Sequence, residues 1–221
     1  MNFDKQKYYD QDYQVIMNNG LIGMVSRFIH KHIDWAWRNR EIGSVLEVGA
    51  GNGQHFNLGE LNCQEYLEVD IRKLNRITTN KSEIVPKRLV CDATHLKVLP
   101  DSSYDLVIAT CLIAHLDFPE VALRNWRRVL KKPGGELCIY VPCDPGLVLR
   151  FLRFFTTKRK FVKMGYNHAY QHWTEHRNHF PMLDTLIKEV FAQDRVSRSF
   201  IPFYLKSWNL NIYCLYRIRV F

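Results

Sequence analysis

The sequence predicts an α/β protein built on a doubly wound, mostly parallel sheet. From residue 44 onward, short apolar runs alternate with helical patterns, as in parallel strands linked by helices. A glycine-rich turn follows the first of these runs, and an acidic residue follows each of the next two. The chain has 221 residues, 47% of them hydrophobic, which is enough for one such domain with a sizeable core.

Five runs have the length and apolar content of buried parallel strands. They lie at residues 45–48, 66–69, 88–91, 105–110 and 136–141. Two further strands within residues 190–221 are expected to run antiparallel to each other and to close the sheet. The prediction is therefore a seven-stranded sheet.

Helical patterns precede, separate and follow these strands. Apolar residues recur at helical spacing over 21–38, and 119–130 and 181–191 have the same pattern. We expect a single domain over 1–221. Its predicted parts are an N-terminal helical lid (1–40), a ligand-binding core (44–141), an inserted substrate cap (145–185) and the closing strands (190–221). The aromatic rings of the lid either pack against the sheet or line a substrate cleft.

The net charge of +9 is concentrated in residues 141–221, which hold 13 Lys+Arg against 5 Asp+Glu. Residues 150–163 carry six cations and no acid among apolar side chains. This pattern fits an anionic membrane surface, the phosphates of a nucleotide-sugar, lipid-linked glycan or RNA, or a cap helix with a buried apolar side.

The six cysteines contain no C-x-x-C pair, and no apolar run approaches the ~20 residues that span a bilayer. A reduced, cytoplasmic protein is therefore expected.

The most informative stretch is residues 45–53, Val-Leu-Glu-Val-Gly-Ala-Gly-Asn-Gly. Its alternate glycines permit a tight turn and a close approach of ligand to backbone, at the strand end where α/β sheets bind nucleotides. Three acids belong to the same edge of the sheet: Glu47, Asp70 and Asp92. An acid at the tip of the second strand is well placed to accept both hydroxyls of a ribose.

A dinucleotide-binding enzyme is the main alternative for this pocket. Such enzymes usually carry Gly-x-Gly-x-x-Gly, whose third glycine permits close helix packing. Here the chain continues Gly53-Gln54-His55 instead.

The ordered motifs together resemble the class I S-adenosylmethionine-dependent methyltransferases, of the broad bacterial group called type 11. The matching stretches are residues 46–53, 68–70, 91–93, 99–107 and 128–137. They cover about 44–141 in the right order and spacing, and the matches at Asp92-Ala93 and Pro133-Gly134-Gly135 have no place in a dinucleotide enzyme. The resemblance implies a Rossmann-like methyltransferase fold, S-adenosyl-L-methionine as cofactor, and methyl transfer as the reaction.

The resemblance also implies roles around the methionine half of the cofactor. The turn would pass beneath it, through Gly49, Ala50, Gly51 and Gly53. Glu47 would hold the amino group, directly or through water. Thr110, at the tip of the fourth strand, would lie near the methionine moiety.

For the adenosine half, the resemblance implies that Asp70 binds the ribose hydroxyls and that Ile71 lies against the adenine. Asp92 would accept from the adenine amino group, with the backbone of Ala93 beside it. A helix N-cap without a ligand is the structural alternative for Asp70.

Two histidines are candidate catalytic bases. A hydroxyl acceptor needs a base near neutrality, most often His, whereas an amine needs only its uncharged form. His115 follows the fourth strand at the rim of the expected methyl site. His176 belongs to a group that would share one helix face with His168, His172 and His179. Structural histidines and a plain polar helix remain alternatives.

The spacing of this histidine group can bind a divalent metal, with help from Glu175. Nothing else in the chain supports a metal, so we predict none.

We expect methyl transfer to a small molecule, such as the hydroxyl or amine of an anionic sugar or nucleotide-sugar. Residues 175–178 and 207–211 are similar to methyltransferases of bacterial surface-polysaccharide and sugar modification. An RNA methyltransferase stays open because of the basic surplus, although no Asn-Pro-Pro-Tyr-like motif follows the fourth strand, so nucleic acid is the less favoured partner. A non-catalytic membrane-surface protein that retains the cofactor fold also stays open, with peripheral contact through 150–163. The sequence does not indicate the oligomeric state.

Overall fold

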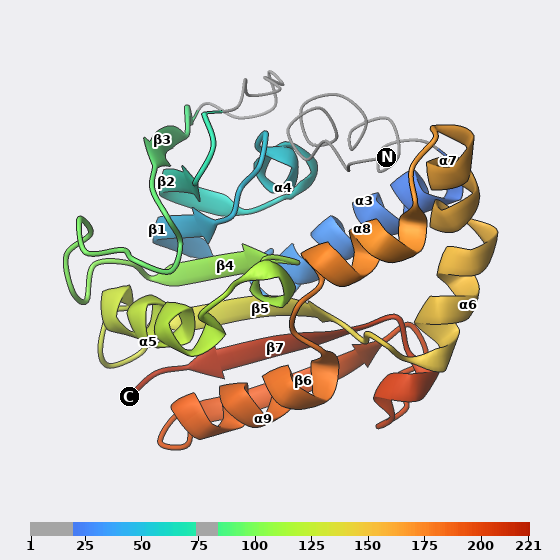
Figure 1. Ribbon diagram of the computed structural model, residues 1–221. Coiled ribbons are helices and arrows are strands. Elements are labelled where there is room, and N and C mark those ends of the chain that lie inside the picture. The colour runs from blue at the N-terminus through green and yellow to red at the C-terminus, as the bar shows by residue number, and fades with distance from the viewer. Residues whose placement is uncertain (1–19, 74–83) are drawn as a thin grey trace.

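The computed structural model describes residues 20–73 and 84–221. Its seven-stranded sheet has the order β3-β2-β1-β4-β5-β7-β6 (Figure 1). The strands are β1 (Glu41–Val48), β2 (Asn62–Asp70), β3 (Lys87–Val90), β4 (Leu106–Thr110), β5 (Glu136–Pro142), β6 (Arg195–Ile201) and β7 (Tyr213–Arg219). Among these strands β7 alone runs in the direction opposite to the other six. The predicted seven-stranded, mostly parallel sheet is confirmed.

Helices cover both faces of the sheet and the edge at which its parallel strands end (Figure 1). Those packed on the two faces are α3 (Gly20–Asp34), α4 (Gln54–Leu58), α5 (Pro119–Val129) and α9 (Phe180–Val190). Those near the strand ends are α6 (Leu147–Phe155), α7 (Thr157–Lys163) and α8 (His168–Glu175). Two short 3-10 turns, η2 (Ile113–His115) and η3 (Trp208–Leu210), complete the set.

Successive side chains of the central strands pack into two different cores, one on each face of the sheet. In β1, Val45 packs into the core that contains Ile33 of α3, whereas Leu46 packs into the core that contains Trp126 of α5 and Leu183 of α9. Successive side chains of a strand point to opposite faces, so one apolar run serves both cores. This is why the central strands are recognisable as nearly continuous apolar runs.

The helix predicted over 21–38 ends at Asp34. Trp37 lies just beyond it, fully buried, and its indole donates a hydrogen bond to the Glu136 carboxylate. Trp35 remains exposed. Trp37 therefore packs against the sheet, and the lining of a substrate cleft by lid rings stays a prediction. Residues 1–19 of the predicted lid, with its tyrosines, lie outside the described residues.

The segment predicted as a cap, 145–185, comprises α6, α7, α8 and the first half of α9. α9 packs on the sheet through Leu183 and Ile187, so its residues belong to the core. The remaining three helices stand at the strand ends, and their binding of substrate stays a prediction.

Candidate active site

The glycine-rich turn leaves β1 and is bound at once to the tip of β2. The amides of Gly49 and Ala50 both donate to the Val69 carbonyl, at 2.8 and 3.0 Å. Gly49 has φ +72°, and a Cβ there would lie 2.9 Å from the Leu112 side chain. Gly51 has φ +58°, but a Cβ there would meet nothing within 4 Å. The positive φ values favour glycine at both positions, and a side chain at Gly51 would point into open space.

Asp70 ends β2 and braces this turn. Its Oδ2 accepts from the Gly51 amide and its Oδ1 from the Arg72 amide, both at 2.9 Å. Oδ1 also accepts from Arg72 Nε at 3.3 Å, so Oδ2 is the oxygen that retains a lone pair for another donor. The next residue, Ile71, is 67% exposed. Asp70 and Ile71 thus offer a hydrogen-bond acceptor beside an exposed apolar side chain, and their expected roles toward ribose and adenine stay predictions.

Asp92 lies at the neighbouring strand tip, two residues beyond β3. Asp70 and Val90 are register partners, so the two carboxylates share one edge of the sheet. The Asp92 side chain is 44% exposed and its Oδ1 accepts from the Thr94 amide at 2.7 Å. Burial opposes ionisation, but hydrogen bonds from Thr94 outweigh it and lower the pKa of Asp92. The Ala93 carbonyl accepts from the Trp126 indole at 2.9 Å, which fixes this turn on α5.

Glu47 lies inside the protein. It is 1% exposed, and its Oε2 accepts from the Tyr66 hydroxyl at 2.9 Å. Burial raises the pKa of Glu47 to about 7. Because Glu47 is buried, we expect the amino group of the cofactor to reach it through water rather than directly.

His55 belongs to the same buried charge group. It lies on α4, which begins after Gly53 at φ +80°. His55 Nε2 lies 3.2 Å from Asp34 Oδ1. Although burial opposes protonation, the Asp34 carboxylate raises the pKa of His55 to about 9. The residue that interrupts a dinucleotide motif is therefore part of a buried ion pair.

The two histidines predicted as candidate bases lie in contact. His115 ends η2, the turn that follows Thr110 at the tip of β4. Its ring centroid lies 4.6 Å from that of His176, with the planes at 71°. Cys111, directly after β4, has φ +55°, a conformation uncommon for a residue other than glycine. β4 therefore turns sharply at its tip, before the η2 segment that carries His115.

Asn178 holds these distant segments together. Its amide N–H donates to the Ala114 carbonyl at 3.1 Å. Its side-chain Nδ2 donates to the carbonyls of Ile113 and Leu116, at 3.1 and 2.6 Å. These three bonds fasten the chain beyond α8 onto η2 and thereby set His176 against His115.

The helix expected to carry four histidines ends at Glu175, so His176 and His179 lie outside it. His168 stacks on His172 at 5.9 Å, and His172 contacts His176 at 4.6 Å. His179 instead packs on Trp173 at 5.6 Å. The expected single helical face is therefore wrong in its C-terminal part, because the bonds of Asn178 to η2 redirect the chain.

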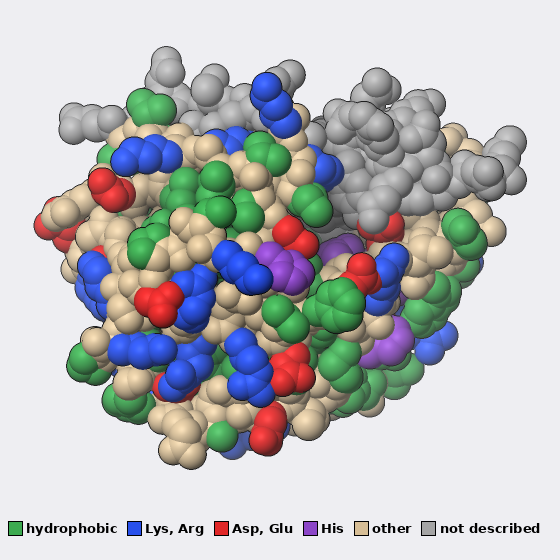
Figure 2. Space-filling view, turned by 60° about the vertical axis from the view of Figure 1, so that its left-hand side comes forward, with side chains coloured by type: hydrophobic (Ala, Val, Ile, Leu, Met, Phe, Trp, Pro, Cys, Tyr) green, Lys and Arg blue, Asp and Glu red, His purple; other side chains and the backbone are tan. Residues whose placement is uncertain are grey.

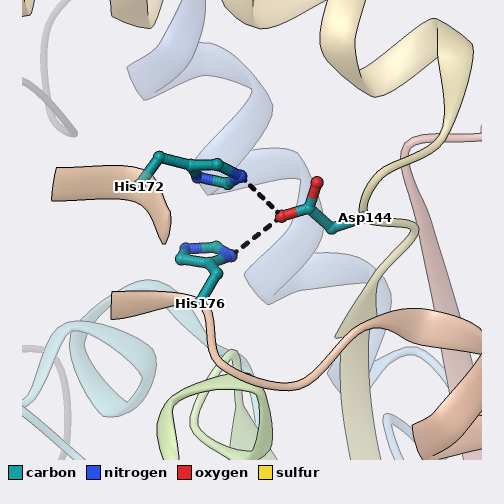
Figure 3. Close-up of side chains that lie close together, drawn as sticks. All are labelled: Asp144, His172 and His176. Atoms are coloured by element: carbon teal, nitrogen blue, oxygen red, sulfur yellow. Dashed lines mark ion pairs between the residues drawn. The ribbon is translucent and has the colours of Figure 1, made fainter. Parts of the chain in front are cut away.

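Asp144 is the functional candidate that the sequence analysis missed. It follows β5, is 2% exposed, and points toward His172 and His176 (Figure 3). Its Oδ2 lies 2.9 Å from His172 Nε2 and 3.2 Å from His176 Nδ1. Its Oδ1 lies 2.9 Å from Arg153 Nη1.

The electrostatics of this cluster follow from burial and from close cations. Burial opposes ionisation of Asp144, but contacts with His172, His176 and Arg153 hold its pKa well below the usual range. Burial lowers the pKa of His176 to about 3, so this imidazole is neutral. On the face shown in Figure 2, histidine side chains reach the surface among acidic and basic side chains.

A signal for Asp144 does exist in the sequence. It is the one acid between Glu136 and Glu175, and it comes three residues after the strand predicted over 136–141, in an otherwise basic region. An isolated acid in such a position indicates a specific partner.

Comparison with known proteins agrees with this geometry. Residues 46–139 match the family model described as a methyltransferase domain. A SAM-dependent methyltransferase from Archaeoglobus fulgidus has the same fold, with a TM-score of 0.65 and 16% identity over 96% of this chain and 99% of that chain. The N-methyltransferase NodS from Bradyrhizobium japonicum WM9, solved with S-adenosyl-L-homocysteine, has a TM-score of 0.60 and 15% identity over 96% and 98% of the two chains.

The fold by itself does not define one reaction. The [4+2]-cyclase SpnF shares it, with a TM-score of 0.54 and 16% identity over 97% of this chain and 94% of that chain. A sequence comparison with curated proteins gives no match. The domain match spans the glycine-rich turn and strands β2 to β4, with parts of β1 and β5. Residues 46–139 are therefore similar to a methyltransferase domain, and the chain shares its seven-stranded fold with S-adenosylmethionine-dependent methyltransferases of known structure.

Proposed function

We propose that this protein transfers the methyl group of S-adenosylmethionine to a hydroxyl or amine of a small molecule. One observation carries the proposal. At the sheet edge that holds the glycine-rich turn, His115 from the β4 side contacts His176 from the segment inserted after β5, and His176 in turn contacts Asp144. A group that accepts protons thus lies beside the predicted cofactor crevice.

The cofactor would be held by the strand tips. Asp70 and Ile71 would receive the ribose and the adenine, and Asp92 and Ala93 would border the adenine. The turn from Gly49 through Gly53 would carry the methionine half, with Thr110 beside it and Glu47 acting through water. The sulfonium supplies a methyl group that is already activated.

Transfer then requires that the acceptor atom be aligned with the methyl carbon and the sulfur, and that water be excluded. A hydroxyl acceptor also needs a base. We assign the base to His115, because it lies on the turn that directly follows the β4 tip, with His176 behind it. The acceptor oxygen loses its proton to His115 and forms a bond to the methyl carbon, while the carbon–sulfur bond breaks. An amine acceptor enters uncharged and needs His115 only as a hydrogen-bond partner.

The acceptor class proposed is a sugar or nucleotide-sugar that carries negative charge. The half-buried Arg153 lies at the cluster, and residues 150–163 carry six cations and no acid. Guanidinium and ammonium groups in such numbers suit phosphate. The N-methyltransferase NodS has the same fold, which keeps an amine among the acceptors to be tested.

A labelled-methyl transfer screen tests the proposal, with nucleotide-sugars, small amines, phenols and bulk RNA as acceptors. We expect label in a small anionic acceptor and none with Asp70→Ala at low cofactor concentration. Label in RNA alone would establish the RNA methyltransferase alternative. Cofactor binding without transfer to any acceptor would favour a non-catalytic role.

We also propose that α6 and α7 contact an anionic lipid surface. Phe151, Phe154 and Phe155 are 69%, 51% and 46% exposed. Lys158 and Arg159 lie over the Phe154 and Phe155 rings, at 4.9 and 5.6 Å from their centroids. Exposed aromatic rings flanked by cations suit the headgroup region of an anionic membrane. No helix in the described ranges is long and apolar enough to cross a bilayer.

Sedimentation with vesicles tests this contact. The chain should sediment with anionic vesicles and remain in solution with zwitterionic ones. Replacing Lys158, Arg159 and Lys163 by Gln should weaken partitioning on the order of 100-fold, because each basic residue near an anionic surface contributes about 1 kcal/mol. A control triple of exposed lysines elsewhere, Lys87, Lys97 and Lys132, should leave it unchanged. Equal losses of vesicle binding in both triple variants would show that binding depends on the net charge of the protein and not on α6 and α7.

A further inference from the structure

The Asp144 cluster has a geometry that hydrogen bonding does not account for. Neither carboxylate oxygen of Asp144 nor Nδ1 of His176 makes a hydrogen bond within the described structure, although Asp144 is 98% buried. Arg153 Nη1 lies 3.2 Å from His172 Nε2, so this guanidinium borders both the carboxylate and one of the imidazoles.

His172 Nε2 lies 2.9 Å from Asp144 Oδ2. His176 Nδ1 faces the same oxygen at 3.2 Å. The three candidate ligand atoms all lie within 4.8 Å of one another, and they come from a β5 loop and the end of α8 (Figure 3).

We propose that Asp144, His172 and His176 bind a divalent transition-metal ion of the Zn²⁺ type. Two imidazoles and a carboxylate are ligands that such ions take. Bond lengths of 2.0–2.1 Å in a tetrahedral site imply about 3.4 Å between ligand atoms, close to the two distances observed. Three protein ligands leave one position open, as in metal sites that bind a substrate oxygen.

Arg153 fits this assignment as a competitor. Its guanidinium contacts Asp144 Oδ1 and His172 Nε2, so it neutralises the carboxylate when no metal is bound. A bound ion would displace it from His172 and leave it at Oδ1. The His176 ring contacts His115, so the open position would lie near the proposed base and receive the acceptor oxygen, a role that rests on the proposed function.

Binding of Co²⁺ and Zn²⁺ to the untagged, metal-stripped full chain tests the site without cofactor or acceptor, so the result is independent of methyl transfer. We expect one equivalent by calorimetry, with the visible absorption of tetrahedral Co²⁺. Asp144→Asn and His172→Ala should each weaken binding by roughly 100-fold or more, since even outer partners of a metal ligand contribute 10–100-fold. His179→Ala, which removes a histidine outside the cluster, is the matched control.

Thermal unfolding in a chelator shows that each variant is folded before binding is measured. Arg153→Met should tighten Co²⁺ binding, because it removes a cation from two of the ligands. The proposal is overturned by no stoichiometric binding in the wild type, by equal affinity in Asp144→Asn and His172→Ala, or by weaker binding in Arg153→Met.

Discussion

Replacing Glu47 by Gln tests the buried charge group beneath the glycine-rich turn. The pKa of Glu47 is raised from 4.5 to about 7, chiefly by burial. Between these values the folded state keeps a proton that the unfolded state has released. The free energy of unfolding of the wild type therefore falls as pH rises through this window.

The magnitude follows from the size of the shift. Each unit corresponds to about 1.4 kcal/mol, so the wild type loses at most about 3 kcal/mol between pH 4.5 and 7. Glutamine resembles the protonated acid and does not titrate. Glu47→Gln should therefore match the wild type at the acidic end and exceed its stability near pH 7. Attraction between ionised Glu47 and His55 reduces the gain, since the variant loses this contact.

Urea denaturation followed by circular dichroism, at several pH values across the window, measures this difference. The control is Glu65→Gln, which removes an exposed carboxylate on β2 and should leave the pH dependence unchanged. If the stability curves of the wild type and Glu47→Gln ran parallel over the whole window, Glu47 would not be a buried acid with a raised pKa.

Three further substitutions probe the cofactor and acceptor sides. Asp70→Ala should weaken S-adenosylhomocysteine binding by about 1–3 kcal/mol in calorimetry, because it removes charged acceptors, and unchanged affinity would exclude Asp70 from the site. Gly49→Ala should lower the free energy of unfolding by roughly 1–3 kcal/mol, because φ is +72° and Leu112 lies 2.9 Å from the new Cβ; a melting temperature equal to that of Gly51→Ala would contradict the steric argument. His115→Ala should retain cofactor binding but lose a factor on the order of 10²–10⁴ in turnover of a hydroxyl acceptor, and full activity would remove it as the base.

Strand ends were more predictable than strand starts. The predicted end of the first strand at Val48 is confirmed, as is that of the fourth at Thr110, because glycines or a change of pattern follow them. β1, however, begins at Glu41, four residues before the predicted start. Its first half includes Ser44, whose hydroxyl donates to the Ser103 carbonyl and to Asp105. Polar side chains interrupt the apolar pattern that predicts a strand, and their hydrogen-bond partners are distant in sequence, so the start of β1 was not predicted.

The proposed cofactor half and acceptor half of the site also differ in how well the sequence predicts them. The cofactor half is local, because a turn and the residue after a strand are adjacent in sequence to the strands that position them. The acceptor half depends on contacts between distant segments. The spacing of His172 and His176 was visible, but their partner Asp144 lies 28 residues before His172 and carries no spacing signal.

In the proposed function, this division would give acceptor choice to the segment inserted between β5 and β6. The same fold serves a methyltransferase and a [4+2]-cyclase, so the reaction is decided by the groups that face the ligand rather than by the sheet. Here Asp144, His172 and His176 come from this segment, and the bonds of Asn178 to η2 hold it against His115. Asn178→Ala removes the two side-chain bonds without touching the glycine-rich turn or Asp70. It should therefore raise the KM for the acceptor and lower kcat while leaving cofactor affinity unchanged, and a parallel loss of cofactor binding would show that the two halves of the site are not independent.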